Sequence, residues 1–187
     1  MRITKVYTRQ GDRGETRLGG GQTVGKDNIR IETFGTVDEL NATIGIALVF
    51  GCSKTAERIL ETVQHLLFTL GGDLCVLKED QAKWQMKAID ASHVTLLEGF
   101  IDELNKQLKP LEEFILPGGS KPAVFLHQAR CVCRRSERLA VRLSREEEIG
   151  DFVIPFLNRL SDLLFVVSRY ENQEGKYQEV YWDKDRI

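Results

Sequence analysis

The segment 120–145, SKPAVFLHQARCVCRRSERLAVRLSR, constrains the fold more strongly than any other part of the chain. Two glycines precede it, Ser120 can cap the free amides of a helix, and Pro122 suits a first helical turn. At about 100° per residue, one broad face collects apolar side chains and a single serine: Phe125, Ala129, Val132, Ser136, Leu139 and Leu143. The pattern predicts one long helix that ends near Glu148.

The same helix would carry a charged group at the edge of its apolar face. Arg130, Arg134 and Glu137 fall within roughly 60° of one another on the helical wheel. One interpretation is a salt-bridged bundle helix, because charge ladders are common on helix surfaces. The other is an anion site, because guanidinium groups bind phosphate through two parallel hydrogen bonds. The wheel alone leaves both interpretations open.

Apolar residues recur at helical spacing in four more segments. They begin at Thr36, Thr55, Ser92 and Asp151 and end near Phe50, Leu77, Pro110 and residue 175. Thr36 and Glu39 have the spacing of a capping box, and Asp151 is the predicted cap of the last helix. Residues 78–91 have the composition of a polar linker. Five helices with short connections predict an all-α, up-and-down, ferritin-like bundle.

The 187 residues, without an internal repeat, are expected to form one domain spanning 1–187. We assign 1–35 to an N-terminal loop, 36–175 to the bundle and 176–187 to a C-terminal tail. A net charge of −2 gives no basic surplus for nucleic acid. The chain has no apolar run of membrane length and no signal peptide, so no membrane is expected as a partner and the cytoplasm is the expected compartment.

The four cysteines (Cys52, Cys75, Cys131 and Cys133) are expected to act as small apolar fillers. Cys131 and Cys133 stand two apart on the predicted helix and point to different sides, which makes them poor disulfide or metal partners.

The N-terminal 35 residues differ from the rest. Residues 1–8 contain a short apolar alternation that suits a strand, and residues 8–21, TRQGDRGETRLGGG, combine glycine, hydroxyls and charge. Glycine lets a backbone approach a ligand closely and turn its N–H groups toward phosphate. The alternative is a disordered N-terminal arm. Residues 20–26 also match GxxxxGK, but Asp27 replaces the required hydroxyl, no strand is predicted before it and 28–31 do not read as a helix start. We therefore reject a standard P-loop, and keep Lys26 as a candidate phosphate ligand.

Two other chemistries of helical bundles are not supported. A di-iron carboxylate site needs Glu-x-x-His on two helices, and none of the three histidines follows a glutamate at that spacing. His127 lies one turn before Arg130, but no nucleophile with a triad partner is evident. A polyanion site remains, built from Arg130, Arg134, Lys26 and the glycine-rich loop. Glu137 or Asp162 would hold Mg²⁺ or a ribose.

Phe114 stands in a short apolar run, FILPGG, just before the long helix. It is either a plug over the end of the bundle or an exposed functional aromatic, and the plug is the more ordinary interpretation. The tail 176–187 contains a strand-like stretch, YQEVYW, expected to reach a neighbouring molecule.

Four of these stretches occur together in one known family. The motifs TRQGDRG at 8–14, VDELN at 37–41, FILPGG followed by Arg130-x-x-x-Arg134-Arg135-x-Glu137-Arg138, and FLNRLSD at 156–162 resemble PduO-type ATP:cob(I)alamin adenosyltransferases. The similarity covers nearly the whole chain, in order. Arg13 stands where many members have lysine, and this change keeps the charge.

The resemblance implies a fold and a set of site residues. The fold is a five-helix cobalamin adenosyltransferase-like bundle with an ordered N-terminal ATP loop, assembled as a homotrimer with active sites between subunits. The implied ATP loop contains Thr8, Arg9, Gln10, Gly11, Asp12, Gly14, Thr16, Arg17 and Lys26. Further nucleotide contacts fall on Arg134, Arg135, Ser136, Glu137, Arg138 and Asn158. Phe114 and Asp162 are placed at the corrin, and Asp38 bridges to Arg130 across the interface.

The resemblance also implies a reaction that explains why no protein base was found. Cob(I)alamin, a strong nucleophile, attacks the 5′-carbon of ATP and expels triphosphate, so the enzyme orients the reactants and stabilises the leaving charge with arginine, lysine and Mg²⁺ carried by ATP. The implied catalytic set is Phe114, Arg130, Arg134, Glu137 and Asp38. Within it, Phe114 would favour four-coordinate cob(II)alamin, which is easier to reduce. An electron-donating reductase and a cobalamin-dependent acceptor enzyme are the implied partners.

The rival interpretation is a non-catalytic trimer that senses a nucleotide or carries a corrinoid on the same bundle. The intact Arg130–Glu137 motif together with Phe114 favours the enzyme.

Overall fold

The structure is a computed structural model, and it describes residues 7, 9, 11–85 and 87–186. Within these residues it contains two strands and six helices: β1 Glu15–Arg17, β2 Thr23–Gly25, α1 Ile29–Val49, α2 Lys54–Cys75, α3 Lys78–Gln81, α4 Ala91–Asn105, α5 Lys121–Leu143 and α6 Val153–Glu174. Five helices are long and α3 is a single turn, so the predicted all-α bundle is confirmed. The expected strand in residues 1–8 lies almost wholly outside the described residues.

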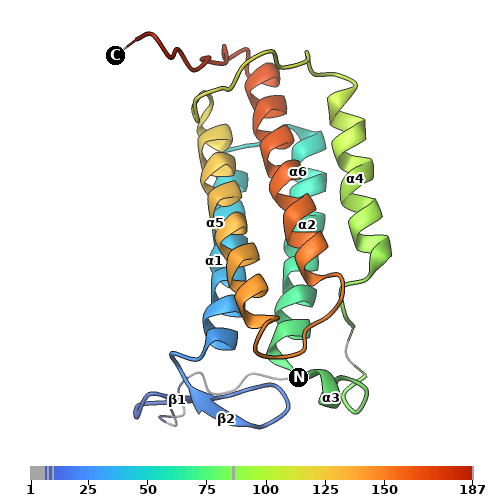
Figure 1. Ribbon diagram of the computed structural model, residues 1–187. Helices are drawn as coiled ribbons and strands as arrows, with labels where there is room; N and C mark the ends of the chain where they lie inside the picture. Colours follow the sequence, from blue (N-terminus) through green and yellow to red (C-terminus); the bar gives the residue numbers. More distant parts are fainter. Residues whose placement is uncertain (1–6, 8, 10, 86, 187) are drawn as a thin grey trace.

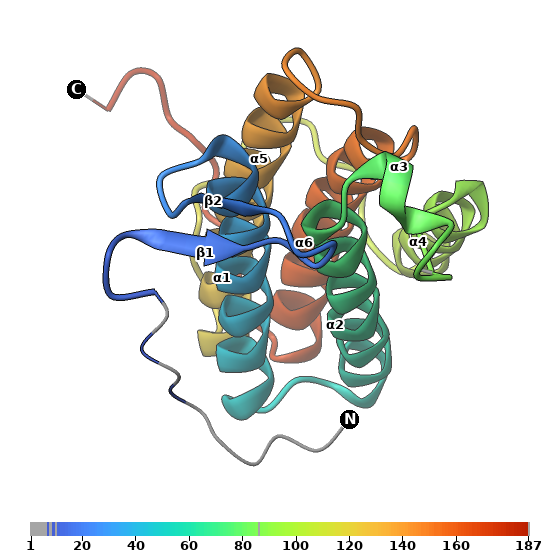
Figure 2. The same ribbon diagram turned by 90° about the horizontal axis from the view of Figure 1, so that it is seen from below.

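The five long helices run alternately up and down (Figure 1). Helix α5 packs between α1 and α6, α2 packs on α1, and α4 lies against the outer side of α6. The β1–β2 hairpin and α3 lie together at one end of the bundle, as the view along the helices shows (Figure 2). The connection before α5 and the C-terminal tail lie at the opposite end.

Helix α5 is buried on a broader face than predicted, because it has neighbours on two sides. Ser120 caps it as expected, accepting a 3.3 Å hydrogen bond from the Ala123 amide. Phe125 and Leu139 are only half-buried, at the edges of the packed face. The fully buried set is Ala123, Leu126, Ala129, Cys133, Ser136, Ala140 and Leu143. The helix ends at Leu143, five residues before the predicted end.

The four cysteine side chains differ in burial. Cys133 is buried, and burial raises the pKa of its thiol. Cys52 and Cys75 are half-buried, whereas Cys131 is exposed, so the filler role predicted for Cys131 is wrong.

Helix α1 begins seven residues earlier than predicted. Asn28 is its cap and accepts a 2.8 Å hydrogen bond from the Arg30 amide, while Thr36 lies inside the helix and donates to the Glu32 carbonyl at 2.7 Å. The capping box expected at Thr36 is therefore wrong, and the bundle starts at residue 29 rather than 36. The signal was missed because the buried residue near the start is Arg30, a charged side chain that interrupts the apolar pattern.

Arg30 is satisfied by partners far away in the sequence. Its guanidinium donates to Glu147 at 2.8 Å, to the Leu74 carbonyl at 2.8 Å and to the Glu148 carbonyl at 3.2 Å. These bonds tie the start of α1 to the end of α2 and to the α5–α6 connection. A buried charge is tolerated only with such pairing.

Three other predicted bounds also change. Helix α3 occupies part of the expected linker. Helix α4 begins at Ala91 and is capped by Asp90, two residues before the start expected at Ser92. Helix α6 has Phe152 at its cap position, and that residue makes no side-chain capping bond. The cap predicted at Asp151 is therefore wrong.

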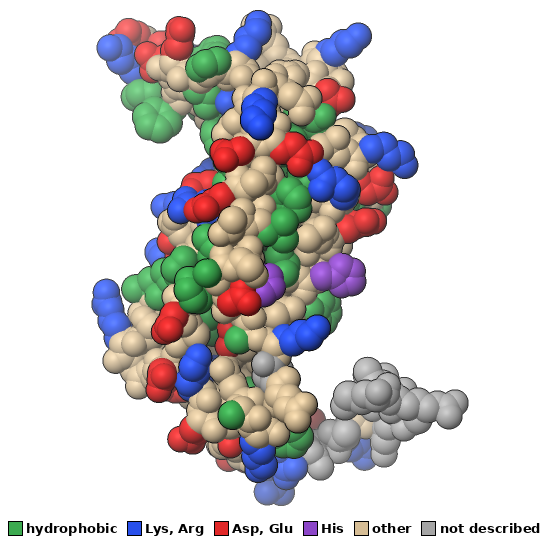
Figure 3. Space-filling model, turned by 90° about the vertical axis from the view of Figure 1, so that its right-hand side faces the viewer, with side chains coloured by type: hydrophobic (Ala, Val, Ile, Leu, Met, Phe, Trp, Pro, Cys, Tyr) green, Lys and Arg blue, Asp and Glu red, His purple; other side chains and the backbone are tan. Residues whose placement is uncertain are grey.

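Acidic and basic side chains are interspersed on the face that carries α4 (Figure 3). None of the described helices is long and apolar enough to cross a membrane.

Candidate functional site

A pocket of about 520 Å³ lies between the connection before α5 and the facing sides of α5 and α6. Its lining residues are Leu111, Glu112, Glu113, Phe114, Ile115, Arg130, Arg134, Ser161, Asp162 and Phe165. Four of the predicted site residues, Phe114, Arg130, Arg134 and Asp162, are thus brought together from three separate segments. The volume is in the range of small-molecule sites, which commonly combine an apolar lining with a few charged groups.

Phe114 is 79% exposed, so it does not plug the bundle, and the more ordinary of its two interpretations is wrong. Its backbone carbonyl accepts a hydrogen bond from the Trp182 amide at 2.7 Å. The side chain stands on the wall of the pocket with little packed against it. A large uncovered aromatic at a pocket is available to contact a flat apolar ligand.

The two arginines of the pocket come from successive turns of α5. Arg130 is half-buried; its Nε is buried without a hydrogen-bond partner, and its Nη2 lies 3.8 Å from the Cys131 sulfur. Arg134 is exposed and makes no ion pair or hydrogen bond with any described residue. Guanidinium groups that are not paired with a protein carboxylate are suited to bind an anionic ligand. Among the described residues neither arginine forms an ion pair, so the interpretation as a salt-bridged bundle helix is not supported for these two side chains.

The polar wall continues along α5 and α6 beyond the pocket. Asn158 Nδ2 donates to Glu137 Oε1 at 3.0 Å, and Asp162 accepts from Arg159 at 3.2 Å. Glu137 and Asn158 were both predicted at the nucleotide, and the structure places them in contact. Arg138 is exposed on the next position of α5.

Two residues predicted at the nucleotide point away from the pocket. Ser136 is fully buried and donates to the Val132 carbonyl at 3.2 Å, which does not fit a ligand contact through its side chain. Arg135 lies on the α1 side of α5, where it pairs with Glu39. The neighbouring Asp38 is exposed beside a second hollow, of about 450 Å³, between α1 and α2. Asp38 and Arg130 make no ion pair within the described chain.

The predicted ATP loop is ordered over its described part. Thr16 pairs with Val24 in the β1–β2 hairpin, and the Lys26 amide donates to the Gly14 carbonyl at 2.8 Å. Gly11 lies so close to Lys26 that an added Cβ would be 3.0 Å from its Nζ. These contacts argue against the disordered arm for residues 11–26.

The other residues of the predicted ATP loop lie on or next to the β1–β2 hairpin, and most of those that are described are exposed. Arg9, Asp12, Gly14 and Arg17 are exposed, whereas Thr8 and Gln10 lie outside the described residues. The Gly19 amide donates to the Cys75 carbonyl at 2.9 Å, and Gln22 donates to Asp80 at 2.5 Å. The hairpin is therefore anchored on the end of α2 and on α3.

Two of the three grounds for rejecting a P-loop were wrong, because Asn28 caps helix α1 and strand β1 precedes Gly20. The rejection itself rests on the hairpin: residues 20–26 include strand β2 of an antiparallel pair, not a loop after a parallel strand.

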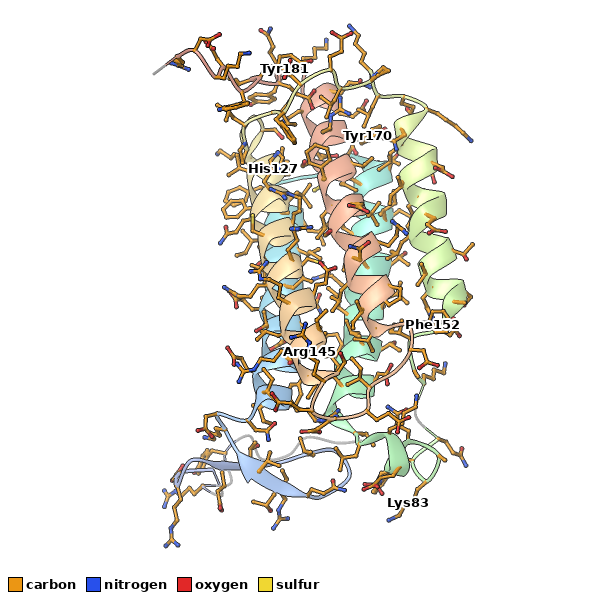
Figure 4. All side chains as sticks on the ribbon, viewed as in Figure 1. Lys83, His127, Arg145, Phe152, Tyr170 and Tyr181 are labelled. Atoms are coloured by element: carbon orange, nitrogen blue, oxygen red, sulfur yellow. The ribbon has the colours of Figure 1, made fainter. Side chains whose placement is uncertain are left out.

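Phe114 lies on the connection at the end of the bundle opposite the hairpin, and the pocket extends from there along α5 and α6 as far as Arg134 and Asp162. Figure 4 shows His127 and Tyr181 at the end that carries the connection before α5, and Arg145 at the end that carries the hairpin. None of the described residues of the loop lines the pocket of its own chain.

His127 is a titratable group with a shifted pKa beside the pocket residue Arg130. Its Nε2 lies 3.3 Å from the Ser168 hydroxyl, and Nδ1 is buried without a partner. Burial lowers its pKa, and the positive charge of Arg130 lowers it further. His127 is therefore neutral near pH 7, and its ring packs at 6.1 Å from that of Phe165. Sequence reasoning missed Phe165 as a pocket residue, although its position one turn after Asp162 was a usable signal.

Metal ligation depends on the donors that lie together. Among the described residues, no group of three or more His, Cys, Asp or Glu side chains could hold a metal ion. Glu137 and Asp162, the two candidates from the sequence, are each already engaged with a neighbouring side chain.

Comparison with known proteins gives one consistent family. Residues 6–171 match the family model described as cobalamin adenosyltransferase. A cobalamin adenosyltransferase of Cupriavidus metallidurans is 42% identical over 186 residues, covering 99% of this chain and 97% of that protein. A corrinoid adenosyltransferase of Bacillus subtilis is 43% identical, covering 98% and 94%.

Solved structures show the same fold. A variant PduO-type ATP:corrinoid adenosyltransferase from Lactobacillus reuteri, complexed with cobalamin and ATP, superposes with a TM-score of 0.90 at 36% identity, covering 96% of this chain and 100% of that one. Another variant from the same organism, complexed with ATP, gives a TM-score of 0.87 at 34% identity, covering 95% and 100%.

Proposed function

Because the chain belongs to the cobalamin adenosyltransferase family, we propose that it transfers the 5′-deoxyadenosyl group of ATP to the cobalt of cob(I)alamin, giving adenosylcobalamin and triphosphate. The observation that carries this function is the pocket that joins an exposed aromatic, Phe114, to two arginines, Arg130 and Arg134, neither of which has an ion pair with a described residue. The apolar part suits a corrin ring and the cationic part suits a triphosphate.

The chemistry needs orientation and charge, not a protein base. Cob(I)alamin forms the new carbon–cobalt bond with its own electron pair, and the electrons of the broken carbon–oxygen bond leave with triphosphate. Arg134, which has no protein partner among the described residues, is assigned to the phosphate charge. Preorganised cations of this kind act mainly by stabilising charge as it develops. The hydrogen-bonded pair Glu137–Asn158 is assigned to the nucleoside.

Phe114 is assigned to the lower face of the corrin. An aromatic there would keep water and the lower ligand from cobalt and leave cob(II)alamin four-coordinate, which eases its reduction to cob(I)alamin. The exposed position of the ring supports this role, because it needs a ligand rather than the core to cover it.

We also propose a homotrimer with active sites between subunits. No described residue of the ATP loop lines the pocket of its own chain, which supports a site completed by the loop of another copy. Helix α1 also presents exposed apolar side chains, with Val49 86% exposed, and Phe68 on α2 is 74% exposed beside the hollow next to Asp38. Such surfaces are typical of interfaces. Asp38 is then available to pair with Arg130 of another copy.

Mg²⁺ is expected to enter with the phosphates of ATP, and we assign it no protein ligand. An electron-donating reductase and a cobalamin-dependent acceptor enzyme complete the proposed partners, and the cytoplasm, where ATP and reductants are supplied, is the proposed compartment.

One assay tests the function against the rival binding protein. Cob(I)alamin and ATP are mixed with the protein, and the corrin absorbance is followed for the appearance of a carbon–cobalt bond. Turnover in excess over protein supports the enzyme. Binding of both ligands without any adenosylcobalamin would favour a nucleotide sensor or corrinoid carrier.

A further inference from the structure

The connection that carries Phe114 is long and has no helix or regular strand of its own, so other elements must fix it. Residues 106–120 are held at both ends by α6. Asn172 Nδ2 donates to the Gly118 carbonyl at 3.0 Å, and its Oδ1 accepts from the Ser120 amide at 2.9 Å. Near the other end, Arg169 Nη2 donates to the Lys109 carbonyl at 2.9 Å.

The middle of the connection is held by the C-terminal tail of the same chain. The Trp182 amide donates to the Phe114 carbonyl at 2.7 Å, and the Leu116 amide donates to the Val180 carbonyl at 2.8 Å. Between these two bonds, Ile115 and Tyr181 form an antiparallel bridge. The Phe114 side chain is largely uncovered, so this backbone pairing is what fixes the backbone from which its Cα–Cβ bond projects. Residues 180–182 of the tail thus pair with their own chain, and the contact with a neighbouring molecule expected from the sequence stays a prediction.

The tail is itself held by one ion pair. Arg169 Nε donates to Glu179 Oε1 at 2.8 Å, and Nη2 donates to Oε2 at 3.2 Å. The two side chains are 8% and 18% exposed. By contrast, Tyr177, Val180, Tyr181 and Trp182 are each about half exposed and contribute little packing. A bidentate, mostly buried arginine–carboxylate pair is much stronger than a surface pair.

One guanidinium therefore joins three elements: α6, the start of the connection and the tail. We infer that the Arg169–Glu179 pair is a positioning device for Phe114, which docks the tail so that its backbone holds the aromatic ring at the wall of the pocket. This inference rests on the proposed role of Phe114 at the corrin. Neither Arg169 nor Glu179 lines that pocket, so neither is assigned a contact with the reacting atoms.

Two matched pairs of variants test the inference in the full-length protein. Glu179→Gln removes the charge at nearly constant shape, and Glu174→Gln, at an exposed glutamate near the end of α6 without a described partner, is its control. Trp182→Pro removes the amide that bonds to Phe114, and Trp182→Ala is its control because it removes the side chain and keeps that amide.

The first readout does not depend on activity. Amide hydrogen exchange of the peptide that covers 114–116 is expected to accelerate by about tenfold or more in Glu179→Gln and Trp182→Pro, because local opening becomes easier. Both controls should exchange like the parent protein. Unchanged exchange in both test variants would overturn the inference outright.

The second readout follows cobalt. With ATP bound, the spectrum of added cob(II)alamin reports its four-coordinate fraction. This fraction, and the adenosylation rate from cob(II)alamin, should fall about tenfold in both test variants while ATP affinity stays unchanged. Introducing Glu179→Gln into Phe114→Ala should add little, because two changes that act through one group are not additive.

The outcomes separate this inference from the proposed function. If Phe114→Ala itself leaves the cob(II)alamin spectrum and rate unchanged, the role proposed for Phe114 fails. If Phe114→Ala is defective and Glu179→Gln behaves like Glu174→Gln, the proposed role stands and the positioning role is wrong. A Glu179→Gln loss that adds fully to the Phe114→Ala loss would also overturn the positioning role, because the tail would then act on the ligand without Phe114.

Discussion

Replacing Phe114 with alanine is expected to leave the fold nearly intact and to impair the handling of cob(II)alamin. Truncating a fully buried phenylalanine costs about 3–5 kcal/mol. Phe114 is 79% exposed, so only about a fifth of that loss, roughly 0.6–1 kcal/mol, applies here. For a chain of 187 residues, this lowers Tm by no more than about 4 °C.

The kinetic loss should depend on the oxidation state that is supplied. Without the aromatic ring, water or the lower ligand can return to cobalt, and reduction of bound cob(II)alamin becomes harder. Chemically prepared cob(I)alamin bypasses that step and should restore much of the rate. The experiment measures thermal unfolding, ATP affinity, and adenosylation from cob(II)alamin and from cob(I)alamin. A variant that melts much earlier and is equally slow from both oxidation states would refute the reasoning.

Three further predictions concern charged residues. Arg134→Ala should weaken ATP binding by about 10- to 150-fold, the equivalent of one charge-assisted phosphate contact of about 1.5–3 kcal/mol. The control Arg142→Ala, at an exposed arginine of the same helix, should leave ATP affinity unchanged. If calorimetry gives Arg134→Ala the same ATP affinity as the parent protein, the role of Arg134 is excluded. Asp38→Ala should lower activity, and combining Asp38→Arg with Arg130→Asp should restore part of it; a double variant no better than the worse single one would argue against a direct pair. Arg30→Met should cost about 3–5 kcal/mol of unfolding free energy, because Glu147 and two carbonyls lose their donor; a denaturant midpoint equal to that of the parent would contradict this.

Local sequence patterns determined the class of the fold. The cap at Ser120 and the apolar spacing of the long helix depend on residues within four positions of one another, and both predictions hold in the structure. The segments predicted from apolar spacing to begin at Thr55 and Asp151 likewise form the long helices α2 and α6. Local rules do not need the rest of the chain, which is why five long helices could be predicted from the sequence.

The candidate site was predictable only in part. Phe114, Arg130 and Arg134 carry an aromatic surface and positive charge, and their residue types alone made them candidates. Ser136 carries a hydroxyl in the same motif, yet packing between α1 and α6 places it in the core. The motif gives the order of the side chains, but the neighbours of α5 decide which of them face outward.

Contacts between distant parts of the chain decided the remaining features. The start of α1 brings Arg30 to Glu147, 117 residues away, and the backbone of Phe114 pairs with a tail in which Glu179 is bound by Arg169. A buried arginine or an exposed phenylalanine contradicts the local pattern of its own segment. The charge of Arg30 is tolerated in the core because the folded bundle supplies partners that no short window of sequence contains, whereas the Phe114 ring is left uncovered by that bundle.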